Sequence, residues 1–349
     1  MAPSSTAAQD ARTGADAGVV AGTGAGAVTG AGAGAVTDAD AGAGAATDAG
    51  AATDAGAGAG APRRIALEGA GVRLSALLAE PADGAPRAAV VALHGSGMNA
   101  AYFHARADPR LSLLTLGPRL GYTVLALDRP GYGRSASAVP DGQRLAEQTR
   151  TVRAALADFA ARHGTGAGLF LLAHSFGGKV ALTAAADDGV PGLLGLDVSG
   201  CGHEYAVPPG AVSDLDGPER RRRNWGPLRL YPPGTFVAGG AFVATVPARE
   251  FADLEDWPRV LDTAAPRIRV PVRFTFAEHE GWWRHDDTRL RSLRARFTAA
   301  PRVVVERRAD AGHNISLGWA ARSYHLSALA FLEECLVRVE AAPPGTRVS

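Results

Sequence analysis

Apolar and polar positions alternate along the chain in blocks that predict a regular succession of strands and helices. Short, continuous apolar runs are typical of strands that are covered on both faces of a sheet. We expect such strands at 88–93, 122–128, 169–174, 193–198, 272–276 and 302–306. Between and after them, amphipathic stretches such as 144–163 and 319–339 have the spacing of helices. This alternation predicts an α/β fold with a mostly parallel sheet and helices on both faces.

The same pattern sets the limits of the folded domain. Segments 64–67 and 72–79 form a predicted β-hairpin at its start. Residues 1–62 are dominated by Ala, Gly, Thr and Asp and contain no aromatic side chain. Such a segment buries too little apolar area to offset the entropy of ordering it, so we expect a disordered tail. We assign 63–340 to one domain and expect a flexible C-terminus at 341–349.

A long insertion interrupts the alternation after the strand at 193–198. Residues 202–266 separate it from the next strand and are rich in Pro, Arg and aromatic side chains. In open α/β sheets, binding and catalytic sites lie at the carboxyl ends of the parallel strands. An insertion of this size at that edge predicts a lid over the site.

Composition and charge narrow the classes of function. The 349 residues are 46% hydrophobic and carry a formal net charge of +1, which gives no support to nucleic-acid or membrane-surface binding. The two cysteines, Cys201 and Cys335, form no metal or disulfide framework, which favours a reducing compartment. No apolar run is long enough to span a membrane, and residues 1–18 have no secretory pattern. We therefore expect a cytoplasmic protein.

Ser175 is the candidate nucleophile because it occupies a strand–turn–helix junction in the sequence AHSFGG. A serine on such a turn has an exposed hydroxyl and a strained backbone. The residues two positions before and after it must be small, and here they are Ala173 and Gly177. Ala173 replaces the glycine of the usual G-x-S-x-G pattern. From this stretch alone, an ordinary serine in a loop is the alternative.

Four motifs in one order resemble the α/β-hydrolase superfamily over residues 63–340. They are HGSG at 94–97, DRPGYGRS at 128–135, AHSFGG at 173–178 and AGH at 311–313. The resemblance implies the α/β-hydrolase fold with a lid after the sixth strand. It also implies a catalytic triad in the order nucleophile, acid, histidine, with Ser175 as nucleophile and His313 as its base.

Three acidic residues are candidates for the acid of the triad. With the strand at 272–276 aligned on Pro271, the acid of the resembling family falls on Glu280. Glu278 and Asp197 are the alternatives, and Asp310 is close to His313 in sequence but is expected to be a loop residue. The acid has to hold the imidazole in one tautomer and stabilise its charged form.

The resemblance also implies an oxyanion hole made of two backbone amides, those of Phe176 and Ser96. Neighbouring side chains diverge at a sharp turn, so the histidine beside Ser175 is expected to line the pocket and not to react. The residues expected to contact the substrate are His174, Gly97, Trp282 and Trp225.

Two other groups of charged residues resemble binding sites but have simpler explanations. Glu278, Glu280 and His285 lie close together in sequence, but no pair has a recognised metal spacing, so we expect no metal and no cofactor. The arginine run at 220–223 could bind a phosphate or an acidic carrier protein, although such runs are more often solvated helix faces.

These expectations combine into a serine hydrolase that cleaves a carboxylic ester or thioester through an acyl-enzyme. The partner is a small-molecule acyl substrate with an apolar portion, either free or carried by coenzyme A or a carrier. A carbon–carbon bond beside a carbonyl is a further possible target. An acyltransferase or cyclase using the same triad is the alternative, and a non-catalytic small-molecule-binding member of the fold is the second.

Overall fold

The computed structural model describes residues 61–187, 189–212, 215 and 217–341. The predictions for residues 1–60 and 342–349 fall outside this part of the chain. Within it, Cys201 and Cys335 are both buried and free. Across the described ranges, none of the helices is long and apolar enough to cross a membrane.

The core of the fold is an eight-stranded sheet in the order β1-β2-β4-β3-β5-β6-β7-β8. Its strands are β1 (Arg63–Gly69), β2 (Val72–Ala79), β3 (Ala89–Leu93), β4 (Thr123–Leu127), β5 (Leu169–His174), β6 (Leu193–Ser199), β7 (Val272–His279) and β8 (Val303–Gly312). The β1–β2 hairpin is antiparallel and continues antiparallel onto β4, and every pairing from β4 to β8 is parallel. All strands of the parallel part therefore end at one edge of the sheet.

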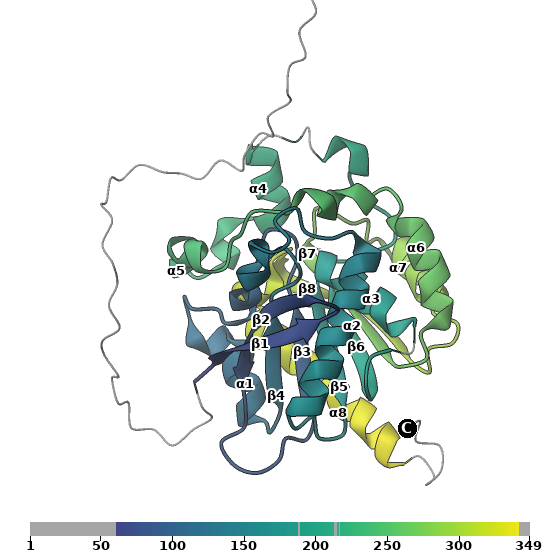
Figure 1. The fold of residues 1–349 in the computed structure, drawn as a ribbon. Helices are drawn as coiled ribbons and strands as arrows, with labels where there is room; N and C mark the ends of the chain where they lie inside the picture. The colour runs from purple at the N-terminus through teal and green to yellow at the C-terminus, as the bar shows by residue number, and fades with distance from the viewer. Residues whose placement is uncertain (1–60, 188, 213–214, 216, 342–349) are drawn as a thin grey trace, which may run out of the picture. The chain divides into compact units, whose positions relative to one another are not determined.

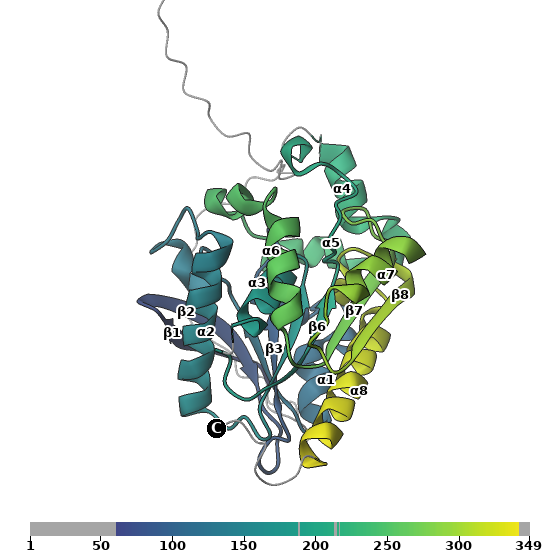
Figure 2. The ribbon, with the colours of Figure 1, turned by 90° about the vertical axis from the view of Figure 1, so that its right-hand side faces the viewer.

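Helices cover both faces of this sheet (Figures 1 and 2). The core on one face contains α2 (Leu145–Arg162), α3 (Phe176–Ala185), α6 (Trp257–Ala264) and α7 (Asp287–Ala295), and the other core contains α1 (Leu113–Arg119) and α8 (Ala321–Glu340). Strand β3 shows why the central strands read as continuous apolar runs. Val91 faces the first core while Val90 and Ala92 face the second, so both sides of the strand are covered.

The insertion divides into two parts. Its first part contains α4 (Gly217–Trp225) and α5 (Gly234–Val237), which both views place beyond one end of the strands. Its last part does not behave as a lid, because α6 belongs to the helix layer packed on the sheet. Trp257 is fully buried there, and its indole N–H donates to the Gly202 carbonyl at 2.7 Å. The apolar face of α6 is thus part of the core and not of the predicted cover.

Short 3-10 turns connect many of these elements. They span Ala100–Phe103, Pro109–Leu111, Gly133–Ala136, Pro209–Ala211, Leu228–Leu230, Ala238–Ala241, Ala248–Asp253, Ala265–Arg267 and Ile315–Leu317. The predicted strands agree with the observed ones except at β7 and β8, which run on to residues 279 and 312. Strand β8 is at the sheet edge, where one face meets water, so polar residues such as Arg307 continue the strand.

Helix α3 buries Lys179, the single lysine of the chain. Its ammonium donates to the Tyr205 hydroxyl at 2.7 Å and lies 5.2 to 5.5 Å from the ring centroids of four aromatic side chains. Those rings belong to Phe176, Tyr205, Trp257 and Trp283. Burial lowers the pKa of Lys179 from its ordinary 10.5 to about 8.

This depressed pKa predicts that Lys179 makes stability rise with pH. Between pH 8 and 10.5 the unfolded chain holds the lysine proton and the folded chain does not, so raising the pH favours the folded state. Relative to Lys179→Met, the native protein should gain about 3 kcal/mol of unfolding free energy from pH 7 to pH 11. Urea unfolding of both proteins across this range measures the difference, in which the titrating groups that do not interact with Lys179 cancel. A difference in unfolding free energy between the native protein and Lys179→Met that does not change with pH would contradict the prediction.

Candidate active site

Ser175 occupies the sharp turn between β5 and α3, with φ +53° and ψ −118°. This positive φ is strained for a residue with a side chain. The backbone is held there because the Ser175 amide donates to the Ser199 carbonyl at 2.8 Å. A Cβ on Gly177 would lie 2.4 Å from the Leu93 carbonyl oxygen, so helix and strand pass too closely for any larger residue. The small-residue requirement read from the sequence is therefore met by close packing at this turn.

His313 joins Ser175 to Glu280 in one hydrogen-bonded chain. Its Nε2 lies 3.2 Å from the Ser175 hydroxyl oxygen, and its Nδ1 lies 2.7 Å from Oε2 of Glu280. Because a carboxylate only accepts, Nδ1 carries the proton and Nε2 is left to accept from the serine. The Trp282 amide donates to the other Glu280 oxygen at 2.9 Å, which fixes the carboxylate. His313 and Glu280 are both buried.

The alternative acids lie elsewhere. Glu278 is exposed and accepts a hydrogen bond from the Asp310 amide at 2.8 Å. Asp197 is fully buried in a different network, where it pairs with Arg273 and accepts from the Tyr324 hydroxyl at 2.7 Å. Burial raises the pKa of Asp197, with the Arg273 charge acting in the opposite direction. Of the three candidates, only Glu280 contacts His313.

Comparison with known proteins places this arrangement in a family. The model of the alpha/beta hydrolase family matches residues 90–324, which include Ser175, Glu280 and His313. The chain belongs to the alpha/beta hydrolase family. No curated protein matches the sequence as a relative.

Solved structures share the fold of this hydrolase at low sequence identity. A carboxyl esterase from Bacillus coagulans in complex with glycerol has a TM-score of 0.57 and 14% identity, over 79% of this chain and 99% of that one. An enzyme that cleaves the ring of the Pseudomonas quinolone signal has a TM-score of 0.58 and 14% identity, over 78% and 100%. The esterase domain of a Rhodothermus marinus protein has a TM-score of 0.50 and 19% identity, over 78% and 98%. At these identities the likeness concerns the fold alone.

The two amides predicted to face an oxyanion belong to Phe176, which follows Ser175 directly, and to Ser96, in the loop after β3. Phe176 is the first residue of α3, where an amide has no partner in its own helix. The Ser96 amide has no acceptor among the described residues, whereas the next amide, Gly97, donates to the Tyr132 hydroxyl at 3.1 Å. A Cβ on Gly95 would lie 3.0 Å from Cβ of Ser175, so the loop passes directly beside the serine.

A buried ion pair connects this loop of the hydrolase to the insertion. Arg129 and Glu250 have fully buried side chains and are 2.7 Å apart. Arg129 also donates through Nε to the His94 carbonyl at 2.8 Å, and Tyr132 donates to Glu250 at 3.0 Å. The Arg129 guanidinium lies 4.9 Å from the ring centroid of Phe176. One residue of the insertion, Glu250, thereby belongs to a cluster that contacts the Phe176 ring and the loop containing Ser96.

His94 acts in this cluster as a neutral ring. Burial, followed by the nearby Arg129 charge, holds the pKa of His94 well below its ordinary value. Its Nε2 accepts from the Arg129 amide at 3.1 Å, so its Nδ1 donates to the Gly95 carbonyl at 2.8 Å. His94 therefore holds the shape of the loop through its ring nitrogens.

Replacing one partner of the buried Arg129–Glu250 ion pair should strongly destabilise the hydrolase. In Arg129→Met, Glu250 stays buried without its cation, and we expect a loss of about 3–5 kcal/mol of unfolding free energy. The double variant Arg129→Met/Glu250→Gln removes the unpaired charge and should recover most of that loss. Urea unfolding of both variants measures this. A double variant less stable than Arg129→Met would contradict the role given to the pair.

The predicted substrate-contacting residues take different positions. His174 is buried, stacks on Tyr102 with centroids 4.9 Å apart and lies 4.7 Å from the His313 ring. Burial, then the His313 charge, holds its pKa well below the ordinary value, so it supports the His313 ring as a neutral group. The Gly97 carbonyl accepts from the Ala244 amide of the insertion at 2.8 Å. For Gly97 and His174, contact with substrate stays a prediction.

Asn224 lies at the end of α4, where Trp225 is its neighbour in sequence and Trp282 contacts its side chain. The Trp282 indole donates to the Asn224 side chain at 3.0 Å. The backbone carbonyl of Asn224 accepts a hydrogen bond at 3.1 Å from the side chain of Asn314, which is the residue directly after His313. Trp225 packs edge-on against Tyr231, with ring centroids 5.2 Å apart. The insertion is thus bonded to the loops that carry both Glu280 and His313.

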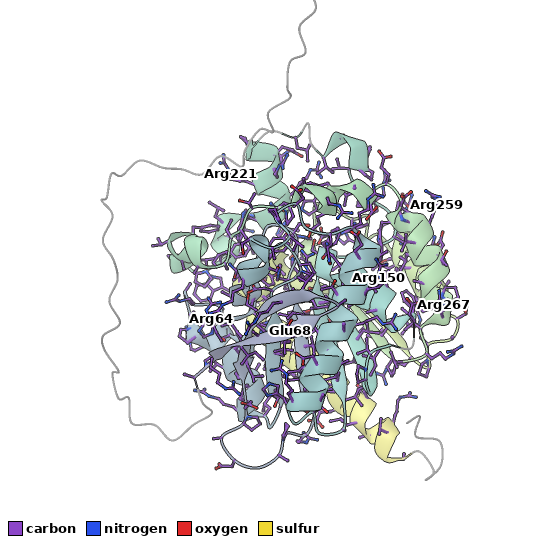
Figure 3. The ribbon with its side chains drawn as sticks, viewed as in Figure 1. Arg64, Glu68, Arg150, Arg221, Arg259 and Arg267 are labelled. Atoms are coloured by element: carbon purple, nitrogen blue, oxygen red, sulfur yellow. The ribbon has the colours of Figure 1, made fainter. Side chains whose placement is uncertain are left out.

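The arginine run at 220–223 is mostly engaged within the protein. Arg222 and Arg223 pair with Glu219, and Arg223 also donates to the Gly281 carbonyl at 2.6 Å. Arg221 is exposed at the outer side of α4 (Figure 3). The run therefore attaches α4 to the Glu280 loop, and anion binding there stays an untested prediction. Among the described residues, no group of His, Cys, Asp and Glu has an arrangement that could hold a metal ion.

Three contributors were missed in the sequence: Tyr102, Asn224 and Glu250. Tyr102 accepts from the Ser316 amide at 3.4 Å and stacks on His174. Asn224 and Glu250 belong to the insertion, which has no regular periodicity to predict which side chains point inward. Glu250 follows an arginine in the sequence Pro-Ala-Arg-Glu-Phe of 247–251, and nothing in that stretch signals a buried carboxylate.

Proposed function

We propose that this alpha/beta hydrolase is a serine hydrolase that cleaves a carboxylic ester or thioester through an acyl-enzyme. The hydrogen-bonded chain from Ser175 through His313 to Glu280 is the observation that carries the proposal. The strained turn supports it, because it exposes a hydroxyl at the edge where parallel strands end. A serine in this position needs a base within hydrogen-bond reach, and Nε2 of His313 is at that distance.

In the acylation step, the Ser175 oxygen attacks the carbonyl carbon and its proton moves to Nε2 of His313. The carbonyl oxygen becomes an anion that the amides of Phe176 and Ser96 would stabilise. The tetrahedral intermediate then breaks the bond to the alcohol or thiol, which takes the proton from His313. Glu280 stays ionised throughout, retaining the Nδ1 proton on the imidazole and stabilising its charged form.

In the deacylation step, water replaces the leaving group. His313 takes a proton from the water, whose oxygen attacks the acyl carbon, and the second tetrahedral intermediate releases the acid. The proton returns to Ser175, so the enzyme is regenerated without any net change. Trp225, Tyr231 and Phe236 form an edge-to-face cluster in the insertion, which favours an acyl substrate with an apolar portion.

Pre-steady-state mixing with p-nitrophenyl esters of increasing acyl length tests the proposal. We expect a burst of p-nitrophenol equal to the enzyme concentration, and a mass increase on the peptide that contains Ser175. A matching thioester series identifies the preferred leaving group. Turnover without any acyl adduct, or no turnover across the series, would contradict the proposal.

Acyl transfer or cyclisation is the second candidate, because the same residues serve when an alcohol or amine replaces water. The contacts of Asn224 and Glu250 favour it, since they hold the insertion against the loops beside the triad, where it can exclude water. Product analysis with and without an added alcohol separates the two. A new ester formed in place of the acid would identify a transferase.

A further inference from the structure

A basic cleft lies between α1 and the start of α8, in the helix layer on the sheet face opposite to α3. Two adjoining cavities of about 180 Å³ and about 520 Å³ form it. Both are lined by Arg110, Arg119 and Arg322. On α1, the lining residues recur at three- and four-residue spacing, so one face of the helix forms one wall.

The charge of this cleft is strongly one-sided. Asp108 is its single carboxylate, and Arg110 already holds it, with Nε and Nη2 at 3.0 and 2.7 Å from its two oxygens. In the part of the chain that the structure describes, neither Arg119 nor Arg322 makes an ion pair with a carboxylate. Arg322 makes one long hydrogen bond to the Arg110 carbonyl, at 3.4 Å. Two of the arginines that line the cleft therefore have no counter-ion among the described residues.

An aromatic ring completes the wall of the larger cavity. Trp319 is 48% exposed, more than any other tryptophan of the chain. Its amide donates to the Leu230 carbonyl at 2.8 Å, which holds its backbone in place. Leu111 is buried beside it and supplies an apolar floor. A half-exposed indole over an apolar floor is a flat surface on which a planar ring can stack.

We propose that this cleft binds a nucleoside diphosphate group, with the diphosphate on Arg119 and Arg322 and the base on Trp319. Guanidinium groups bind phosphate oxygens in pairs, and two phosphates match two unpaired guanidinium charges. A cavity of about 520 Å³ is within the range of small-molecule sites. Inorganic phosphate alone would leave the aromatic wall unused.

Such a group has two sources, a free nucleotide and the nucleotide end of coenzyme A. Trp319 follows His313 by six residues, so their Cα atoms are at most about 21 Å apart. A coenzyme A thioester could therefore place its nucleotide in the cleft while its acyl end approaches Ser175. This second source rests on the proposed function, whereas nucleotide binding itself does not.

Isothermal titration of the full chain with ADP, pyrophosphate and coenzyme A at low salt tests the site. We expect ADP binding that weakens at least tenfold in Arg119→Gln and in Arg322→Gln, and that weakens as salt is raised. Trp319→Ala should weaken the binding of ADP more than the binding of pyrophosphate. Arg150→Gln, which removes an exposed arginine on α2 (Figure 3), is the matched control and should bind ADP as the native protein does.

The outcomes divide clearly. No ADP binding at millimolar concentration would overturn the proposal, as would equal weakening by Arg150→Gln and Arg119→Gln, which would indicate diffuse attraction. Pyrophosphate binding as tight as ADP binding would overturn the role of Trp319. Coenzyme A binding tighter than ADP supports the thioester source, and the reverse order supports a free nucleotide. Because titration needs no turnover, the measured ADP affinities can be interpreted even if the protein does not hydrolyse esters.

Discussion

Ser175→Ala should lower kcat on a p-nitrophenyl ester by about 10⁶-fold. The variant loses the oxygen that attacks the carbonyl, and the His313 Nε2 at 3.2 Å then has no proton to accept. The remaining amides of Phe176 and Ser96 can still polarise a bound ester, so a small residual rate above the uncatalysed reaction is expected. Labelling by a fluorophosphonate probe, which reacts with activated serines, should disappear completely.

Ser137→Ala is the matched control, because Ser137 is an exposed serine that makes only a long hydrogen bond within its own turn. It should retain full labelling and full kcat. Persistent labelling of Ser175→Ala at the native rate would show that another residue is the nucleophile. Equal melting temperatures of the two variants would exclude misfolding as the cause of the loss.

Glu280→Gln should lower kcat by about 10⁴-fold with little change in KM. The side chain keeps its shape, but its amide can donate to Nδ1 of His313, which would stabilise the wrong tautomer. The variant also lacks the negative charge that stabilises the imidazolium. The measurement is steady-state kinetics on the same ester across the pH range in which the protein is folded.

Glu278→Gln is the control for this prediction, since it is the same change two residues away. Glu278 is exposed and bonds to the Asp310 amide, so its replacement should change kcat by less than about twofold. A larger loss from Glu278→Gln than from Glu280→Gln would show that the acid has been assigned to the wrong residue.

The choice between these two glutamates shows where local sequence information ends. In a regular strand, residues 278 and 280 would point to the same face, so alternation cannot separate them. Strand β7 is irregular at this point, because its register against β8 shifts between Ala277 and His279. The strand ends at His279, and the turn that follows brings the Glu280 carboxylate to His313. A register shift depends on the neighbouring strand, which is distant in sequence.

The insertion shows the same limit on a larger scale. Its size and its place at the carboxyl edge predicted a lid, yet α6 is a covering helix of the sheet and Glu250 is a buried partner of Arg129. Neither fact follows from residues 202–266 alone, because both depend on what the insertion packs against. Arg129, by contrast, belongs to a recognisable motif, but its partner lies 121 residues away.

Local features of the sequence were enough to predict the parallel sheet and the turn at Ser175, and the family resemblance supplied the candidate base His313. Continuous apolar runs and small residues around a sharp turn are local properties, and local sterics and burial express them directly. The carboxylate that meets His313, the part of the insertion that belongs to the core and the charges that are buried together became evident from the three-dimensional structure. Those outcomes depend on contacts between distant segments, whose geometry is set when the whole core packs.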